Sequence, residues 1–101
     1  MTISYTEGSI ELFNDFIIIN NTFNDQPQAT HILFAQLSFV QVHNFDSSSN
    51  ALSSIEFIMK DDIKLQYLPS NKIYFESMNE CSLVFNKIFN SFRTYKNNRI
   101  N

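Results

Sequence analysis

The chain has 101 residues, the length of one domain, and 44% of them are hydrophobic, including 11 Phe and 4 Tyr, enough for a buried core without disulfides. Its single cysteine excludes an internal disulfide and fits a reducing compartment. The net charge of −3 argues against nucleic acid as a direct ligand, and no apolar run approaches the roughly 20 residues that cross a bilayer. Because no signal-peptide pattern opens the chain, we expect a soluble, cytoplasmic single domain over residues 1–101, without integral membrane association.

Charge is divided unevenly along the chain. Residues 1–59 contain six acids and no Lys or Arg, whereas residues 60–101 contain all seven basic residues and four acids. The two halves therefore carry −6 and +3, which sum to the net charge of −3. This division predicts a folded protein with one acidic end and one mildly basic end.

The N-terminal fifth predicts three short strands. Residues 2–6 alternate apolar and polar side chains, and Glu7-Gly8 then predicts a turn or bulge, since glycine readily adopts positive φ. Residues 9–13 and 16–20 predict a hairpin, because the intervening Asn14-Asp15 tolerates left-handed conformations. The pairing expected across this hairpin is Ile10 with Ile19, Leu12 with Ile17 and Phe13 with Phe16.

The middle of the chain predicts loops on either side of one long strand. Residues 21–30 are polar and contain Pro27, which predicts a loop, and the Ser-rich residues 44–54 predict another. Residues 31–43 predict the longest strand, apolar on both faces in its first half, so that either both faces are covered or one face is left for a partner. Its expected apolar face changes parity partway, which indicates a bulge or sharp bend. That face comprises Leu33, Ala35, Leu37 and Phe39, followed by Val40 and Val42 on the other parity.

Three more short strands are expected before the helix. Apolar residues alternate over residues 55–60 and again over 63–67, and Asp61-Asp62 predicts the turn between them. Residues 69–71 contain Pro69 and break the chain before a strand over Lys72–Glu76.

The last apolar segment predicts an amphipathic helix over about residues 77–95. Ser77 occupies the N-cap position, and Glu80 three residues later completes a capping box. Apolar residues recur every three or four positions and form one stripe of the helix: Met78, Cys81, Val84, Phe85, Ile88, Phe89, Phe92 and Tyr95. Leu83 lies opposite this stripe among polar residues, and residues 96–101 are expected to form a polar tail.

Together these elements predict an α+β, mostly β fold: a six- or seven-stranded antiparallel bent barrel or two packed sheets, capped by the C-terminal helix. In architecture the chain resembles the pleckstrin-homology-like superfold, most specifically where Lys72–Glu76 leads through Ser77 and Glu80 into the helix. The helix has no Trp, which many members of that superfold carry. The resemblance implies a fold that supports many functions, but the first hairpin turn lacks the cations of the lipid-binding members.

No residue pattern in the sequence indicates catalysis, a metal or a cofactor. His31 and His43 have no Cys or His at ligand spacing, and His43 has only Asp46 three residues later. Cys81 lies on the apolar stripe, where a cysteine behaves as a small hydrophobic residue, and Asp61-Asp62 is explained by a tight turn. We therefore expect a protein that is not an enzyme.

The favoured interpretation is a non-catalytic protein–protein interaction domain that binds a macromolecular partner stoichiometrically, with a homodimer as one form. The candidate partner-binding residues are Phe23 and Phe45 in polar loops and Leu83 on the polar face of the helix. One alternative is a small inhibitor encoded by a phage or mobile element, of the anti-defence or anti-CRISPR type, or an immunity-type antagonist. Another is a peripheral lipid-binding domain, as the resemblance implies.

Overall fold

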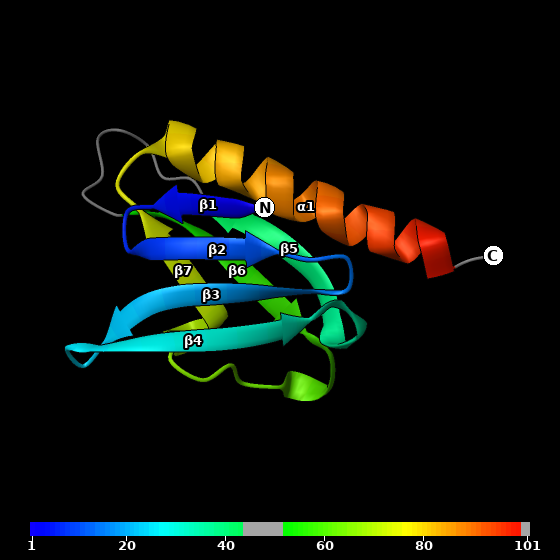
Figure 1. The fold of residues 1–101 in the computed structure, drawn as a ribbon, viewed down its shortest axis with the longest axis horizontal. Helices are drawn as coiled ribbons and strands as arrows, with labels where there is room; N and C mark the ends of the chain where they lie inside the picture. Colours follow the sequence, from blue (N-terminus) through cyan, green and yellow to red (C-terminus); the bar gives the residue numbers. More distant parts are fainter. Residues whose placement is uncertain (44–51, 100–101) are drawn as a thin grey trace.

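The computed structural model describes residues 1–43 and 52–99, which form seven strands, three short 3₁₀ turns and one helix (Figure 1). The strands and the helix are β1 (Thr2–Tyr5), β2 (Gly8–Leu12), β3 (Phe16–Phe23), β4 (Gln26–Leu33), β5 (Leu37–His43), β6 (Ser53–Met59), β7 (Lys72–Phe75) and α1 (Met78–Arg99).

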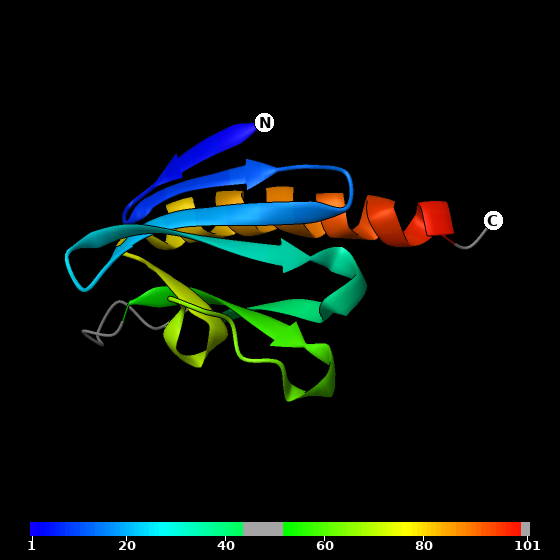
Figure 2. The ribbon, with the colours of Figure 1, turned by 60° about the horizontal axis from the view of Figure 1, so that its bottom comes forward.

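The strands form two antiparallel sheets. β1, β2, β3 and β4 make sheet A in that order, and β5, β6 and β7 make sheet B. Figure 2 shows sheet A and sheet B as two layers, with α1 running along one side of both. The predicted α+β fold with a C-terminal helix is thus confirmed as two packed sheets, and the described residues do not close a barrel. No helix in the described ranges is long and apolar enough to span a bilayer.

The core lies between the two sheets and beneath α1. Sheet A contributes fully buried side chains from β2, β3 and β4, and sheet B contributes Ile55, Phe57 and Ile73. In α1 the buried stripe consists of Cys81, Val84, Ile88 and Phe92. Burying side chains of this size typically stabilises a fold by about 1.5–3 kcal/mol each, so this shared interior holds the sheets and helix together.

The N-terminal hairpin has the predicted register. Ile10 pairs with Ile19 and Leu12 with Ile17, and the Phe13 amide donates to the Phe16 carbonyl at 3.0 Å. Gly8 differs from the expectation, because it has no positive φ and begins β2. A Cβ there would overlap the backbone carbonyl oxygen of Asn20, so close approach to β3 is what requires glycine.

The loop predicted for residues 21–30 is wrong. β3 continues to Phe23 and β4 begins at Gln26, so the two strands meet at a tight turn of Asn24 and Asp25 with φ of 52° and 62°. Two consecutive positive φ values match the turn geometry that suits hairpins, which Asn and Asp tolerate without glycine. Pro27 is accommodated because β4 is an edge strand of sheet A.

The single long strand predicted for residues 31–43 is also wrong, although the bend within it is confirmed. A 3₁₀ turn at Phe34–Gln36 separates β4 from β5 and carries the chain from sheet A to sheet B. The Phe34 amide donates to the Asp15 carbonyl at 3.0 Å instead of continuing a ladder. The predicted common apolar face is therefore lost, because Leu37 is buried whereas Leu33 and Phe39 are exposed.

No strand forms over residues 63–67. The Asn71 side chain takes the place of a partner strand, since its amide oxygen accepts from the Leu65 amide at 2.8 Å and its nitrogen donates to the Ile63 carbonyl at 3.0 Å. Tyr67 adopts a positive φ of 63°, which ends any extended run. The alternating apolar residues of 63–67 therefore lie in an irregular segment, which is followed by the buried Leu68.

The C-terminal helix is longer than predicted, because residues 96–99 are helical and not a tail. Ser77 caps it as expected, its hydroxyl accepting from the Glu80 amide at 3.2 Å. Two members of the predicted apolar stripe are exposed instead of buried, Met78 at 47% and Phe89 at 38%. Both lie at the margin of the contact between α1 and the sheets, so the buried stripe is narrower than the sequence pattern.

Candidate binding surface

The outer face of sheet A is open to solvent. Side chains alternate along each strand, so the residues next to the buried Ile17, Ile19 and Ile32 point away from the core. No other element of the described residues covers this face in either view of the ribbon (Figures 1 and 2). An antiparallel sheet with one solvated face usually carries polar side chains there.

One end of this face is apolar instead. We call this end the apolar patch and define it as Phe13, Phe16, Ile18 and Leu33. Phe16 pairs with Leu33 across β3 and β4, and the Phe13 and Phe16 rings stack with centroids 4.5 Å apart. Phe13 is 43% exposed and Leu33 45%, while Phe16 and Ile18 are half-buried. Four large apolar side chains therefore lie together on a rigid, solvated surface.

A polar network borders the apolar patch. The Asn20 side-chain nitrogen donates to the Glu11 carboxylate at 2.9 Å and to the Ser9 hydroxyl at 3.3 Å. Glu11 pairs with Ile18 across β2 and β3, which places this carboxylate directly beside the patch. The Asn20 bond holds the Glu11 side chain in place, so the border of the patch carries a fixed negative charge.

Three groups that can carry positive charge lie near the apolar patch, and one of them is the Met1 ammonium, which donates to the Leu12 carbonyl at 3.3 Å. His31 pairs with Ile18 across β3 and β4, and its exposed ring stacks on Phe16 with centroids 6.2 Å apart. Lys87 of α1 lines a hollow of about 350 Å³ together with Phe13 and Asn14, behind the β2–β3 turn. The formal charges around the patch are therefore acidic on the sheet and basic at the N-terminus and on the helix.

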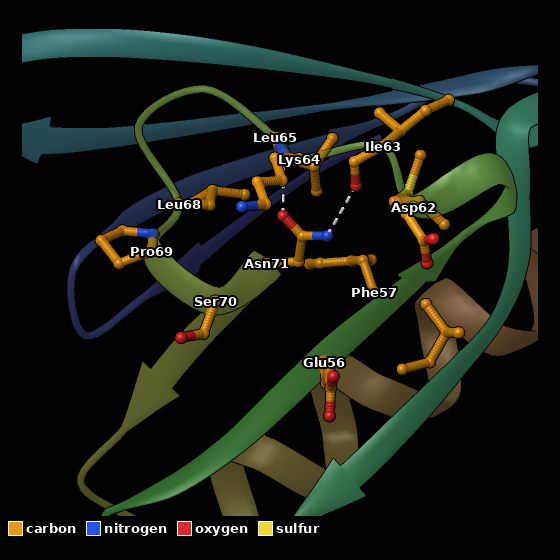
Figure 3. A pocket seen from close by; sticks show the side chains of 12 residues that line it. Glu56, Phe57, Asp62, Ile63, Lys64, Leu65, Leu68, Pro69, Ser70 and Asn71 are labelled. Carbon is orange, nitrogen blue, oxygen red and sulfur yellow. Dashed lines mark hydrogen bonds between the residues drawn. The ribbon is translucent and has the colours of Figure 1, made fainter.

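A separate pocket shares no lining residue with the apolar patch. It has a volume of about 660 Å³ and lies between β6 and residues 62–71, beyond the point where β7 stops pairing with β6 (Figure 3). Its walls are mostly apolar, with Glu56, Asp62 and Lys64 as charged lining residues. Glu56 also contacts His43 at 2.8 Å on the outer face of sheet B. The lining includes neither His nor Cys.

The structure does not bring the predicted partner-binding residues together. Phe23 is half-buried at the end of β3, and its ring packs on Tyr67 with centroids 5.8 Å apart. This contact gives the Phe23 side chain a packing role within the fold. Leu83 is 64% exposed on the outer side of α1, as its spacing predicted. Phe45 lies outside the described residues. Neither Phe23 nor Leu83 belongs to the apolar patch.

The sequence carried a signal for the apolar patch. Phe16, Ile17, Ile18 and Ile19 are consecutive apolar residues in a strand, and alternation must turn two of them outward. The same reasoning applies to Leu33, next to the buried Ile32. We expected a strand that is apolar on both faces, with either both faces covered or one left for a partner, only over residues 31–43. Without the order of strands in the sheets, the sequence could not show whether another element covers the outer face of β3.

The buried titratable groups favour their neutral forms. Burial raises the pKa of the Cys81 thiol to about 11, and the neighbouring Glu80 charge adds to this effect. Burial likewise raises the pKa of Tyr5, with a further contribution from Glu7. Within the described residues, no group of three or more His, Cys, Asp and Glu side chains is placed to hold a metal ion. Cys81 is therefore a packing residue and not an activated nucleophile.

Comparison of the chain with models of known protein families, with curated proteins and with solved structures finds no significant match.

Proposed function

We propose that this chain is a non-catalytic protein-binding domain that engages a macromolecular partner stoichiometrically through the apolar patch of sheet A. The observation that carries the proposal is the exposure of Phe13 and Leu33, at 43% and 45%, beside Phe16 and Ile18 on one uncovered sheet face. Contiguous exposed apolar surface with a polar border is typical of interaction sites on soluble proteins.

The fold does not need these side chains for its core. The inward residues of β3 and β4 already fill the interior, since Ile17, Ile19 and Ile32 are 0% exposed. Exposed apolar side chains keep a hydration cost of roughly 25 cal/mol per Å² that only a partner surface would remove. The apolar patch is thus available for binding without any rearrangement of the core.

The patch also has the physical character of an interface centre. Aromatic side chains dominate binding energetics because they bury much area with few rotatable bonds. The stacked Phe13 and Phe16 rings are held on a three-strand framework, so little conformational entropy remains to be lost on binding. The border formed by Glu11, Asn20 and Ser9 supplies the polar rim that surrounds such centres.

Affinity capture from an extract of the source organism, read by quantitative mass spectrometry, tests the proposal. The bait variants are Leu33→Asp in the apolar patch and Leu83→Asp on α1, which is matched in residue type and also exposed. We expect wild type and Leu83→Asp to retain one stoichiometric protein and Leu33→Asp to lose it, with equal thermal stability of the three baits. If Leu33→Asp retained that protein and Leu83→Asp lost it, binding would be assigned to Leu83 instead. Absence of any stoichiometric protein would overturn the proposal.

A further inference from the structure

We infer that β4 pairs edge to edge with β4 of a second copy of this chain, so that two copies of sheet A join into one antiparallel sheet. The two-fold axis of this homodimer passes His31. The inference is independent of the partner proposed for the apolar patch, because it concerns the backbone of an edge strand. It is carried by a set of unpaired backbone groups on β4 that a second copy can satisfy.

The backbone groups of β4 point alternately to β3 and to the free edge of sheet A. Phe23 pairs with Gln26 across the tight turn between β3 and β4, and residues that close such a turn bond to each other. The Phe34 amide, at the same parity as Gln26, donates to the Asp15 carbonyl just before β3. Even-numbered residues between these two points therefore bond to β3 as well. They are Gln28, Thr30 and Ile32.

The odd-numbered residues of β4 turn their backbone groups to the free edge, which is the lower margin of sheet A in Figure 1. These residues are Pro27, Ala29, His31 and Leu33. Pro27 has no N–H to lose at such a position, which agrees with this orientation. Among the described residues, no hydrogen bond reaches the backbone of the other three from this side. A strand edge with unpaired N–H and C=O groups is a template for another strand.

Other edges of the two sheets are protected by carboxylates. The Thr6 amide, just after β1, donates to Glu80 at 3.2 Å, and the Tyr74 amide of β7 donates to Glu7 at 3.1 Å. Charged side chains on the strand itself are another common protection of an edge. β4 contains no Asp, Glu, Lys or Arg, so it lacks this protection along its whole length.

A two-fold axis at His31 pairs every free N–H of β4. Antiparallel pairing centred there places His31 opposite its own counterpart and Ala29 opposite Leu33 of the second copy. These three pairs give about six hydrogen bonds, two for each pair. Pro27 lies opposite residue 35, which belongs to the 3₁₀ turn Phe34–Gln36 beyond the end of β4. The shared ladder therefore ends before the missing N–H of Pro27 would matter.

The side chains in this register also suit a second copy. Neither copy brings an acid, a Lys or an Arg of β4 to the axis, and the two Asp25 side chains lie at opposite ends of the ladder. Leu33, which is 45% exposed, gains a neighbour in Ala29 of the second copy on the outer face. Phe13 and Phe16 lie off β4, so the joined sheet still presents them to solvent.

Sedimentation equilibrium of the full chain from about 5 to about 500 µM tests the inference. We expect the mass to rise with concentration from 11.8 kDa to twice that value. Hydrogen exchange of the Ala29, His31 and Leu33 amides should slow about tenfold or more over the same range. A chain that stays at 11.8 kDa throughout, or a dimer that protects none of these amides, would overturn the inference.

Single cysteines test the register. His31→Cys places two thiols across the axis at a Cα separation of about 5.5 Å, within reach of a disulfide, so mild oxidation should give a covalent dimer. Ala29→Cys is the matched control, because its two copies lie about 13 Å apart along the ladder and should stay uncrosslinked. Cys81 is buried and common to both variants. Equal crosslinking from both positions, or none from position 31, would contradict the inferred pairing.

Proline tests the backbone bonds directly. Ala29→Pro removes an outward N–H without breaking the ladder to β3, so we expect a folded chain whose dimer is about tenfold or more weaker. Ala29→Ser keeps the N–H and should dimerise like wild type. If Ala29→Pro does not fold, His31→Lys replaces it by placing like charges on the axis, with His31→Gln as its control. A dimer as strong in the folded test variant as in its control would refute pairing through β4.

Discussion

The Glu80 carboxylate of α1 accepts hydrogen bonds from both the backbone amide and the hydroxyl of Thr6, at 3.2 and 2.5 Å. These two residues lie 74 positions apart in the chain. On the other side of the same turn, the Glu7 carboxylate accepts from the Tyr74 amide at 3.1 Å. The β1–β2 turn is thus fastened to the helix by one carboxylate and to the edge of β7 by another, which joins sheet A to sheet B where no ladder connects them.

Glu80→Ala should lower the free energy of unfolding by about 1 kcal/mol, because it removes two charge-assisted bonds at a partly solvated site. Glu76→Ala is the matched control, since Glu76 is an exposed acid just before the helix. Urea denaturation of both variants measures the difference. Equal stability of Glu80→Ala and wild type would show that the contact with Thr6 contributes nothing.

Asn71→Ala should destabilise the chain by about 2–3 kcal/mol, because it removes the bonds to Ile63 and Leu65 and places alanine at a φ of 57°. Ser70→Gly, next to it at a φ of 59°, should instead stabilise the chain by up to about 1 kcal/mol. Thermal unfolding of the two variants checks both signs. A stable Asn71→Ala variant would contradict the role of its side chain in closing residues 62–71 over the pocket.

Stability should fall as the pH rises from about 9 through 11, because Cys81 ionises at about 11 in the folded chain and at its ordinary, lower pKa when unfolded. The folded state favours the neutral thiol, so this contribution is fully present below pH of about 9. The raised pKa of Tyr5 acts in the same direction. Urea denaturation at several pH values measures the effect.

Cys81→Ala isolates the contribution of the thiol to the pH dependence of stability from that of the other titrating groups, because alanine cannot ionise. Its loss of stability at high pH should be smaller than that of wild type, although its stability at neutral pH should be lower from the lost packing. In wild type, a thiol reagent at pH of about 8 should react only as fast as the chain unfolds. Rapid labelling of the native chain would contradict the buried placement of Cys81.

Local patterns predicted the elements whose contacts are close in sequence. The Ile10–Ile19 hairpin and the capped helix at Ser77 were readable because one turn or one cap defines each. The β3–β4 turn was missed because residues 21–30 are mostly polar and include Pro27, a pattern typical of a loop, although Asn24-Asp25 adopts the positive φ values of a hairpin turn. The strand expected over residues 63–67 was wrong because the Asn71 side chain, and not a partner strand, satisfies the backbone there, and alternation of apolar residues does not reveal this.

The candidate surface was harder to predict than the fold. Whether Phe16 and Leu33 face solvent depends on the order of strands in sheet A and on which face α1 and sheet B cover. Neither property follows from periodicity, which gives only the parity of a residue along its own strand. The exposure of Leu83 could be predicted because the 3.6-residue periodicity of a helix identifies its polar outer face from the sequence alone.

Site-specific photo-crosslinking tests the central claim most directly. A benzoyl-phenylalanine at position 13 reports on the apolar patch of sheet A, and the same residue at position 39 reports on the outer face of sheet B, where Phe39 has a similar exposure of 49% against 43%. In cells of the source organism, we predict a crosslink to one heterologous protein from position 13 and none from position 39. Crosslinks to the same protein from position 39 alone, or from neither position, would contradict binding through the apolar patch.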